Sequence, residues 1–271
     1  MGKSSKISGF YKLSPVERLK LVKDFSNLSK EDTEAIQSLS GLKVEDADRM
    51  IENVIGIMSV PLGIAVNFLI NDKDYLIPMA IEEPSVIAAA SNAARIARIG
   101  GGFQASNTGP VMIGQIQAVD IEDPYGGKMS ILESKNTILK KANEQDPILV
   151  KFGGGAKDVS VEVIDSFIGP MVVTNLLVDC RDAMGANAVN TMAEAVAPLI
   201  EEITGGKVNL RIISNLASER LVRSKAIFPK EALGGEDVVV GVVAAYAFAA
   251  ADPYRCATHN KGIMNGVSAV A

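Results

Sequence analysis

The clearest strand-to-helix signal in the sequence is GPMVVTNLLVDCRDAMGANAVNTMAEAVAPLIEEI, residues 169–203. The apolar run over 169–178 predicts a strand, and apolar residues at helical spacing from Val189 onward predict a helix over 187–203. The turn over 182–187 follows the strand and opens the helix directly. This stretch therefore predicts one strand and one long helix that are close neighbours in the fold.

The sequence on either side completes one small domain. It predicts strands over 110–121, 159–164 and 208–213 and a helix over 130–143. Together with the strand and helix of 169–203 the order is βαββαβ, the ferredoxin-like arrangement. An antiparallel sheet of this kind carries both helices on one face.

The remaining sequence predicts a larger and mainly helical domain. Its predicted elements are helices starting at Ser14 and Ser29, helices over 44–57, 84–98 and 237–250, and a hairpin over 63–81 that turns at 71–74. Three glycines at 100–102 mark the boundary. The predicted fold class is α+β, with a large discontinuous domain over 1–108 and 215–271 and a small domain over 109–214 inserted into it.

Composition and charge exclude several classes of protein. The 271 residues are 48% hydrophobic and 22% charged, which excludes a disordered chain and a disulfide scaffold. A net charge of −5 offers no basic field for nucleic acid or an anionic membrane. One histidine and two distant cysteines make no zinc site, and with no signal peptide the chain fits a reducing cytoplasm. The apolar run over 238–251 is too short to span a bilayer, so we expect it to be buried.

The turn over 182–187 is a candidate anion site. The free N–H groups at a helix start attract phosphate, and Gly185 lets a ligand approach the backbone closely. A plain strand-to-helix turn explains the same pattern, and this alternative stays open. The triple glycines at 100–102 and 153–155 lack the spacing of a Rossmann motif and are predicted to form hinges or turns.

Two polar segments suit proton transfer and oxyanion binding. Glu82 and Glu83 end an apolar strand, where a dry environment raises the pKa of a carboxyl and lets it donate a proton near neutrality. The alternative is a solvated helix start, where acidic residues suit the helix dipole. We expect Lys261 to lie in a polar loop, with its ammonium directed at an oxyanion. We expect His259, the only histidine, to be a hydrogen-bonded structural residue.

Several longer motifs occur in order along the whole chain. They are ENVIG at 52–56, EEPS at 82–85, DAMGAN at 182–187 with NTMAE at 190–194, Ser214-Asn215, and DPYRCATHNKGIMNG at 252–266. Together they resemble the class II, bacterial and archaeal 3-hydroxy-3-methylglutaryl-CoA (HMG-CoA) reductases. The resemblance implies reduction of HMG-CoA to mevalonate and CoA by two reduced nicotinamides, or the reverse reaction.

The same resemblance implies an organisation and a set of site residues. It implies a large domain that binds the CoA substrate, a small ferredoxin-like domain that binds the nucleotide, no metal, and a homodimer whose active site lies between subunits. Glu83 matches the catalytic glutamate that supplies a proton, and Lys261 matches the catalytic lysine that stabilises the oxyanion. Positions near the acyl group are matched by Ser85, Asn215, Arg255 and Asn265. The nucleotide segment is matched by Asp182, Ala183, Met184, Gly185, Ala186 and Asn187.

Asp146 bears on the choice between NADH and NADPH, the two cofactors that the resemblance implies. At this position class II enzymes carry an acid that bonds a ribose hydroxyl of the adenosine. Such an acid favours NADH, because it repels the extra phosphate of NADPH. The alternative is an exposed aspartate in the turn before Pro147.

The end of the chain departs from the family pattern. Residues 262–271 contain neither the catalytic aspartate of the family's Gly-Asn-Asp turn nor the C-terminal flap with its histidine. We therefore expect a truncated chain that binds ligands poorly and turns over slowly. Two alternatives stay open: a catalytically weak core that binds CoA or nucleotide, and a structural oligomerisation protein in which the turn and the glycines are scaffolding.

Overall fold

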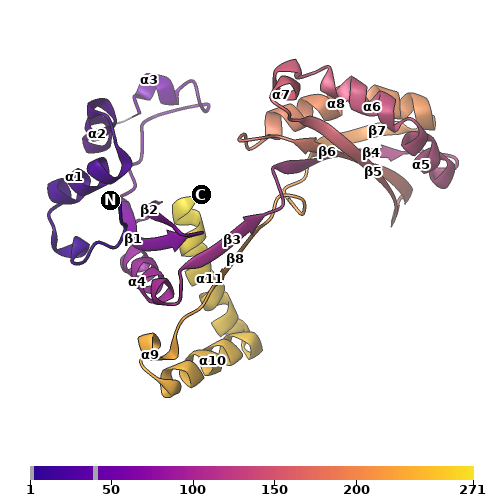
Figure 1. Ribbon diagram of the computed structural model, residues 1–271. Coiled ribbons are helices and arrows are strands. Elements are labelled where there is room, and N and C mark those ends of the chain that lie inside the picture. Colours follow the sequence, from indigo (N-terminus) through magenta and orange to yellow (C-terminus); the bar gives the residue numbers. More distant parts are fainter. Residues whose placement is uncertain (1–2, 39–41) are drawn as a thin grey trace. The chain divides into compact units, whose positions relative to one another are not determined.

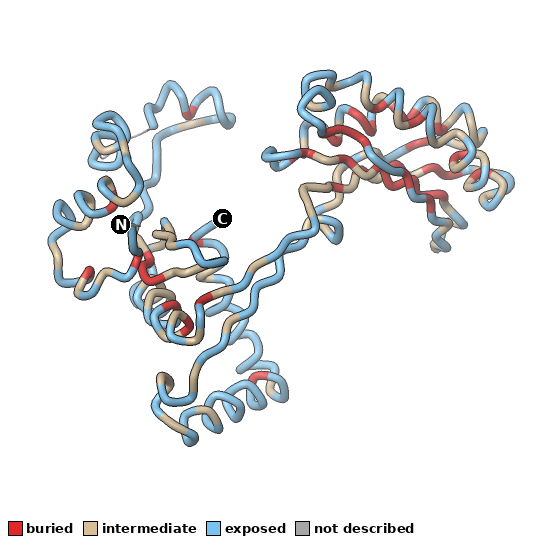
Figure 2. The backbone as a smooth tube through the Cα atoms, viewed as in Figure 1, coloured by how far each residue is buried: buried red, intermediate tan, exposed pale blue. Residues whose placement is uncertain are grey.

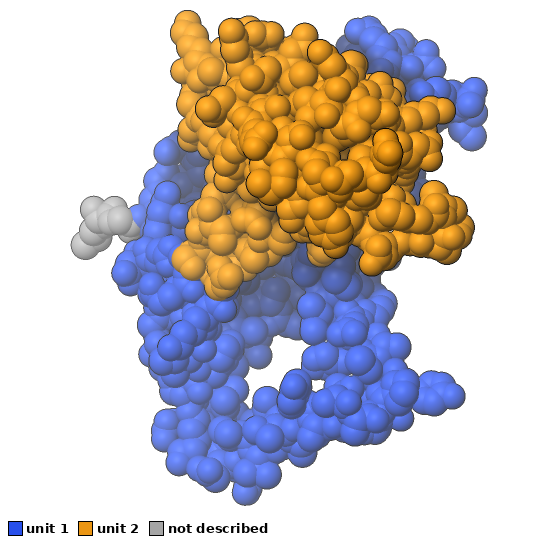
Figure 3. Space-filling view, turned by 90° about the vertical axis from the view of Figure 1, so that its right-hand side faces the viewer, with its two compact units in different colours: residues 1–105, 224–271 blue, residues 106–223 orange. Residues whose placement is uncertain are grey.

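The computed structural model describes residues 3–38 and 42–271, and the chain divides into two compact units. Unit 1 comprises residues 1–105 and 224–271, and unit 2 comprises residues 106–223 (Figures 1 and 3). The described residues form helices and two four-stranded sheets. This confirms the predicted α+β class.

The first helices of unit 1 begin at the predicted serines. The hydroxyls of Ser14 and Ser29 each accept a hydrogen bond from the backbone N–H three residues on, and the acidic side chain there accepts one from the serine N–H. Both ends are thus capping boxes. The elements of this region are the 3-10 helix η1 (Phe10–Lys12), α1 (Pro15–Ser26), α2 (Lys30–Gln37) and α3 (Val44–Ala47).

The helix predicted over 44–57 is wrong beyond Ala47. The apolar side chains that suggested it, among them Met50, Ile51 and Ile55, are exposed. Asn53 has a φ of 58°, a left-handed conformation that interrupts a right-handed helix. A helix of this length is stabilised mainly by packing of an apolar face, so it does not extend where that face has no surface to cover.

The sheet of unit 1 is built on the predicted hairpin. Its strand order is β2-β1-β3-β8, with β1 (Leu62–Ile70), β2 (Lys73–Ala80), β3 (Phe103–Asn107) and β8 (Val222–Ala226). Asn71 and Asp72 both have positive φ, as a two-residue hairpin turn requires. Helix α4 (Val86–Ile99) packs on β1. Close to β3 and β8, the Thr108 N–H donates to the carbonyl of Leu221 at 3.0 Å.

Asp74 of this hairpin forms an ion pair with Arg98 of α4 and accepts hydrogen bonds from Ser5 of the N-terminal segment. Arg98 donates to both carboxylate oxygens of Asp74, at 2.7 and 3.2 Å. The buried Ser5 adds hydrogen bonds from its N–H, at 2.7 Å, and its hydroxyl, at 2.6 Å, to the first of these oxygens. These bonds, chiefly the one from Arg98, lower the pKa of Asp74 to about 2.

Three helices complete unit 1: α9 (Lys230–Leu233), α10 (Glu236–Ala251) and α11 (Pro253–Val270). Helix α10 is apolar all round, yet Ala249 is the one residue in it that is buried. The expectation that this run is buried is therefore wrong for the single chain. Among the described helices none alone has the length and apolarity to cross a membrane, whereas α10 and α11 meet that test only as a pair bent by 114°.

Unit 2 has the strand order β5-β6-β4-β7, with every neighbouring pair antiparallel. Its strands are β4 (Val111–Val119), β5 (Gly155–Ser166), β6 (Gly169–Asp179) and β7 (Lys207–Ile213). Its helices are α5 (Pro124–Glu133), α6 (Lys135–Asn143), α7 (Pro147–Lys151) and α8 (Ala186–Thr204). The helix predicted over 130–143 is in fact two helices that meet at Ser134. Asp123, which caps α5 ahead of Pro124, is the start signal that the prediction missed.

The largest hydrophobic core lies between the sheet and helices of unit 2, where the buried residues gather in Figure 2. It includes Ile116, Leu176, Met192 and Ile200, none of which is exposed. Thr174 on β6 shares this core, and its hydroxyl has no hydrogen-bond partner among the described residues. The buried clusters of unit 1 are smaller.

Candidate active site

The structure brings together three predicted site residues of unit 1. Glu83 follows β2, just before α4, while Lys261 and Asn265 lie one turn apart on α11. The Lys261 ammonium donates a hydrogen bond to Glu83 Oε2, and the two side chains form an ion pair. The side chains are 58% and 42% exposed, so a ligand can reach them. The arrangement presents a cation, a carboxylate and an amide to one point.

Glu83 does not sit in the dry environment that the sequence suggested. Its side chain is exposed, and the hydrogen bond from Lys261 lowers its pKa, with a hydrogen bond from Asn265 acting in the same direction. Of the two interpretations of this segment, the solvated helix start is the one that fits Glu83 in the free protein, and the raised pKa is not. An opposite charge in contact outweighs the small effect of burial here.

Lys261 lies on a helix and not in the predicted loop. Asp252 caps α11, because its Oδ2 accepts a hydrogen bond from the N–H of Arg255 at 2.6 Å, and Pro253 occupies the first helical position. An acidic cap followed by proline is a recognised helix start, so the signal was present in the sequence. The helix places Lys261 and Asn265 on one face, which a loop would not do. His259 is exposed on the same helix.

Ser85 and Arg255 lie at the starts of two helices. Ser85 precedes α4 with a φ of 74°, a left-handed conformation that costs a non-glycine residue of order 1 kcal/mol. Such strain is typical of functional sites. Arg255 lies in the first turn of α11, with its guanidinium 5.6 Å from the ring centre of Phe248. Within the described residues, neither side chain forms a hydrogen bond or an ion pair with Glu83 or Lys261.

The turn over 182–187 lies in unit 2 and opens α8, as predicted. Gly185 precedes the helix with a φ of 102°, and a Cβ there would collide with the Cys180 sulfur. The helix has no side-chain cap and no acidic residue in its first turn. Its first N–H groups are therefore available to an anion, and the first helical turn itself carries no carboxylate that would repel one. These residues fit a nucleotide phosphate.

Asp146 and Asn215 also belong to unit 2. Asp146 caps α7, where its Oδ1 accepts a hydrogen bond from the N–H of Leu149 at 2.8 Å, and the carboxylate stays partly exposed. This cap was not predicted, and it leaves the other oxygen free of that bond. Asn215 is exposed after β7. In the same region Arg220, which the sequence did not single out, donates to two carbonyls of the 182–187 turn.

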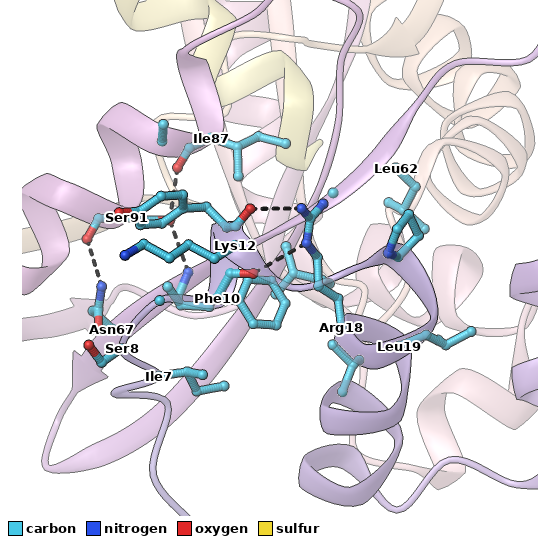
Figure 4. Close-up of a pocket in the computed structure, with 18 of the residues that line it drawn as sticks. Ile7, Ser8, Phe10, Lys12, Arg18, Leu19, Leu62, Asn67, Ile87 and Ser91 are labelled. Atoms are coloured by element: carbon cyan, nitrogen blue, oxygen red, sulfur yellow. Dashed lines mark hydrogen bonds between the residues drawn. The ribbon is translucent and has the colours of Figure 1, made fainter.

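Unit 1 contains a large open pocket that the sequence analysis missed. Its volume is about 1200 Å³, and it is lined by the N-terminal segment, α1, β1 and α4 (Figure 4). Four basic side chains line it, Lys6, Lys12, Arg18 and Arg95, together with apolar side chains such as Phe10 and Ile87. These residues come from distant parts of the sequence, so no local motif announces them.

The described residues contain no group of three or more His, Cys, Asp and Glu side chains that is placed to hold a metal ion. Burial raises the pKa of the Cys180 thiol, which favours its neutral form. Cys180 therefore acts as a packing residue beneath Gly185.

Comparison with known proteins identifies the family of the chain. A family model described as hydroxymethylglutaryl-coenzyme A reductase matches residues 14–271. The chain is 63% identical to the 3-hydroxy-3-methylglutaryl-coenzyme A reductase of Archaeoglobus fulgidus, over 98% of this chain and 61% of that protein. It is 33% identical to a probable reductase of the same name from Borreliella burgdorferi, over 82% of this chain and 51% of that protein. The chain thus spans just over half of the length of these relatives.

A solved structure shows the same fold. The class II 3-hydroxy-3-methylglutaryl-CoA reductase of Streptococcus pneumoniae, bound to NADPH in open conformations, superposes with a TM-score of 0.91 at 39% identity. The match covers 97% of this chain and 72% of the streptococcal chain.

Proposed function

The chain belongs to the hydroxymethylglutaryl-coenzyme A reductase family, and from this premise we propose that the complete protein reduces HMG-CoA to mevalonate and free CoA, or runs the reverse reaction. The observation that carries the proposal is the cluster of Glu83, Lys261 and Asn265. It places a proton-transfer group and a cation where a thioester or aldehyde carbonyl can meet both.

In the proposed mechanism Lys261 stabilises negative charge. A reduced nicotinamide, when bound, supplies the hydride for each of the two reductions. As the carbonyl carbon gains that hydride, the Lys261 ammonium stabilises the charge that develops on the carbonyl oxygen. Because Lys261 is already held by Glu83, its ammonium is oriented before the substrate arrives.

Glu83 has the role of proton donor. Its pKa is lowered while it contacts Lys261, so in the free protein the carboxylate is ionised. When the carbonyl oxygen takes up the contact with Lys261, Glu83 loses the interaction that lowers its pKa and can carry a proton nearer neutrality. We propose that it passes this proton to the oxygen of the aldehyde, while Ser85, Arg255 and Asn265 of unit 1 hold the acyl group; a role of Asn215 in unit 2 stays a prediction from the resemblance.

The pocket of unit 1 suits the CoA part of the substrate. CoA carries phosphates and a long pantetheine arm, and the pocket offers basic side chains beside apolar ones. Helix α4 connects the two places, since Ile87 and Arg95 line the pocket while Glu83 and Ser85 precede the same helix. We expect a Lys12→Met variant to bind CoA more weakly and with less dependence on salt. Lys20→Met, an exposed lysine outside the lining, is the control.

Unit 2 is proposed to be a ferredoxin-like domain that binds the nucleotide through the 182–187 turn. A preference for NADH over NADPH rests on Asp146, whose partly exposed carboxylate would repel a ribose phosphate. Asp146→Asn keeps an oxygen for the α7 cap but removes the charge. It should raise the affinity for NADPH relative to NADH, measured as a ratio of dissociation constants. An unchanged ratio would contradict a role of Asp146 in choosing between NADH and NADPH.

The assembly is proposed to be a homodimer with two-fold symmetry. Helix α10 supports this, because exposed Val240, Val243 and Tyr246 give it an apolar surface that a partner would cover. A cytoplasmic location is proposed from the sequence, and the thiols of Cys180 and Cys256 are both free.

Nicotinamide oxidation in the presence of HMG-CoA tests the proposed activity. We expect Lys261→Met and Glu83→Gln to lower the rate by about 10²-fold or more, since each removes charge stabilisation or proton transfer. Lys225→Met, which removes an exposed lysine of β8, should leave the rate unchanged. Equal rates in all variants would contradict the proposed roles. Binding of CoA and NADPH without turnover would support the alternative of a weak binding core.

A further inference from the structure

Among the described residues, Arg220 is the side chain that bonds to the exposed part of the 182–187 turn. It lies between β7 and β8, and its Nη1 donates to the carbonyl of Ala183 at 2.9 Å and to that of Met184 at 3.3 Å. Within the described residues, this part of the turn is also held by a hydrogen bond from the Ala183 N–H to the Cys180 carbonyl, at 3.1 Å. Asp182, Ala183 and Met184 are all exposed.

These two bonds fix the direction of two backbone amides. In a trans peptide the C=O and the following N–H point in opposite directions across one rigid plane. With the carbonyls of Ala183 and Met184 directed at Arg220, the N–H groups of Met184 and Gly185 face away from it. Gly185 already has a positive φ, so the planes beside it rotate readily if nothing holds them.

The fixed amides add to the donors of α8. The helix begins at Ala186 with no side-chain cap, so its first N–H groups lack intrahelical partners. Successive N–H groups that converge in this way form a cradle for an anion. The cradle is preorganised only while the two peptide planes keep their orientation.

We propose that Arg220 is a positioning residue for the nicotinamide nucleotide: it holds the carbonyls of Ala183 and Met184 so that the following N–H groups face the nucleotide phosphates. The inference rests on the proposed nucleotide role of the 182–187 turn. Arg220 acts here through the backbone. Both bonds come from Nη1, whose two N–H groups have directions fixed by the planar guanidinium, and this fixed geometry, not the charge alone, is what the turn requires.

NADPH binding to the full chain tests this role, measured by the change in nucleotide fluorescence. Three variants separate the fork from the charge. Arg220→Met removes both, Arg220→Lys keeps the charge without the planar fork, and Arg223→Met removes the same charge from an exposed arginine three positions on. CoA binding and the thermal midpoint report on the fold of each variant.

We expect Arg220→Met and Arg220→Lys each to weaken NADPH binding by about tenfold or more, as the loss of charged hydrogen bonds predicts. Arg223→Met should bind as the unaltered chain does, and CoA affinity should not change in any variant. The NMR order parameters of the Met184 and Gly185 amides should fall in both Arg220 variants, because nothing then holds the two peptide planes. This readout needs no nucleotide.

Two results would overturn the inference. If Arg220→Lys binds NADPH as tightly as the unaltered chain, charge alone explains the residue. If both Arg220 variants keep normal affinity and normal order parameters at the Met184 and Gly185 amides, the turn keeps its conformation without Arg220. Failure of the unaltered chain to bind NADPH is a different result, because it removes the proposed function of the turn. Should Arg220→Met fail to fold, Arg220→Lys gives the same decision.

Discussion

The half-buried Asp74–Arg98 ion pair makes the stability of unit 1 depend on pH in the acid range. The pKa of Asp74 is about 2 in the folded protein, against 3.8 when unperturbed. The folded value is lower, so the contribution is fully present above about pH 4 and is lost as the pH falls toward 2. The shift corresponds to about 2 kcal/mol of stability near neutrality.

We therefore predict that Asp74→Asn lowers the free energy of unfolding by about 2 kcal/mol at neutral pH, and by less at pH values near 2. Urea unfolding at several pH values measures both. Asp72→Asn is the control, since this exposed aspartate lies in the adjacent turn and asparagine accepts its positive φ. The same deficit at every pH would mean that the carboxylate charge is not the source of the stability.

For Thr174 we predict a substitution that raises the stability of the protein. Its hydroxyl is fully buried in the core of unit 2 and lacks a hydrogen-bond partner in the part of the chain that is described. Thr174→Val replaces it with a methyl group of similar size and should raise stability by about 1 kcal/mol. Thr174→Ser keeps the hydroxyl, loses a methyl and should lower stability by about 1 kcal/mol. A destabilised valine variant would show that the hydroxyl is satisfied, for example by a buried water.

At the scale of elements, α11 depends on its first residue. Asp252 caps the helix that carries Lys261 and Asn265. Asp252→Ala should cost about 1 kcal/mol and speed amide hydrogen exchange in the first turn of α11. Asp237→Ala, in the first turn of α10 but not at its cap position, is the matched control. Equal effects of both substitutions would contradict the capping role.

Elements with local signals could be predicted from the sequence. The capping boxes at Ser14 and Ser29, the turn at Asn71-Asp72 and the helix after Gly185 each depend on a few neighbouring residues, and all are present. The helix over 44–57 failed because its apolar spacing says nothing about whether a surface exists to cover it. The loop expected around Lys261 failed because the Asp252-Pro253 start was overlooked.

The site divides in the same way. The residues of the site could be named from sequence motifs, but the contacts between them could not be predicted. The ion pair joins Glu83 and Lys261, which are 178 positions apart in the sequence. It lowers the pKa of Glu83, where local hydrophobicity suggested a rise. The pocket and Arg220 were missed for a related reason, since each depends on contacts between segments far apart in the sequence.

For the whole molecule, α10 tests the proposed dimer. If a second copy covers its apolar surface, amide hydrogen exchange within 236–251 should slow as protein concentration rises. Amides of β4 and β6 should not respond, because the core of unit 2 is complete within one chain. Val243→Asp should abolish the dependence and leave a monomer in sedimentation. Exchange in α10 that is independent of concentration would argue against this surface as the interface.

The first and last residues of unit 2 lie close together in space, because β3 pairs with β8 and the Thr108 N–H bonds to the carbonyl of Leu221. A segment whose two ends lie together can be exchanged as a cassette, since the path of the host chain is unaffected by what lies between them. If unit 2 has the nucleotide role proposed above, such a junction lets the nucleotide preference change while unit 1 is retained. Grafting unit 2 of a relative at the same two points then tests whether the nucleotide preference is carried by unit 2.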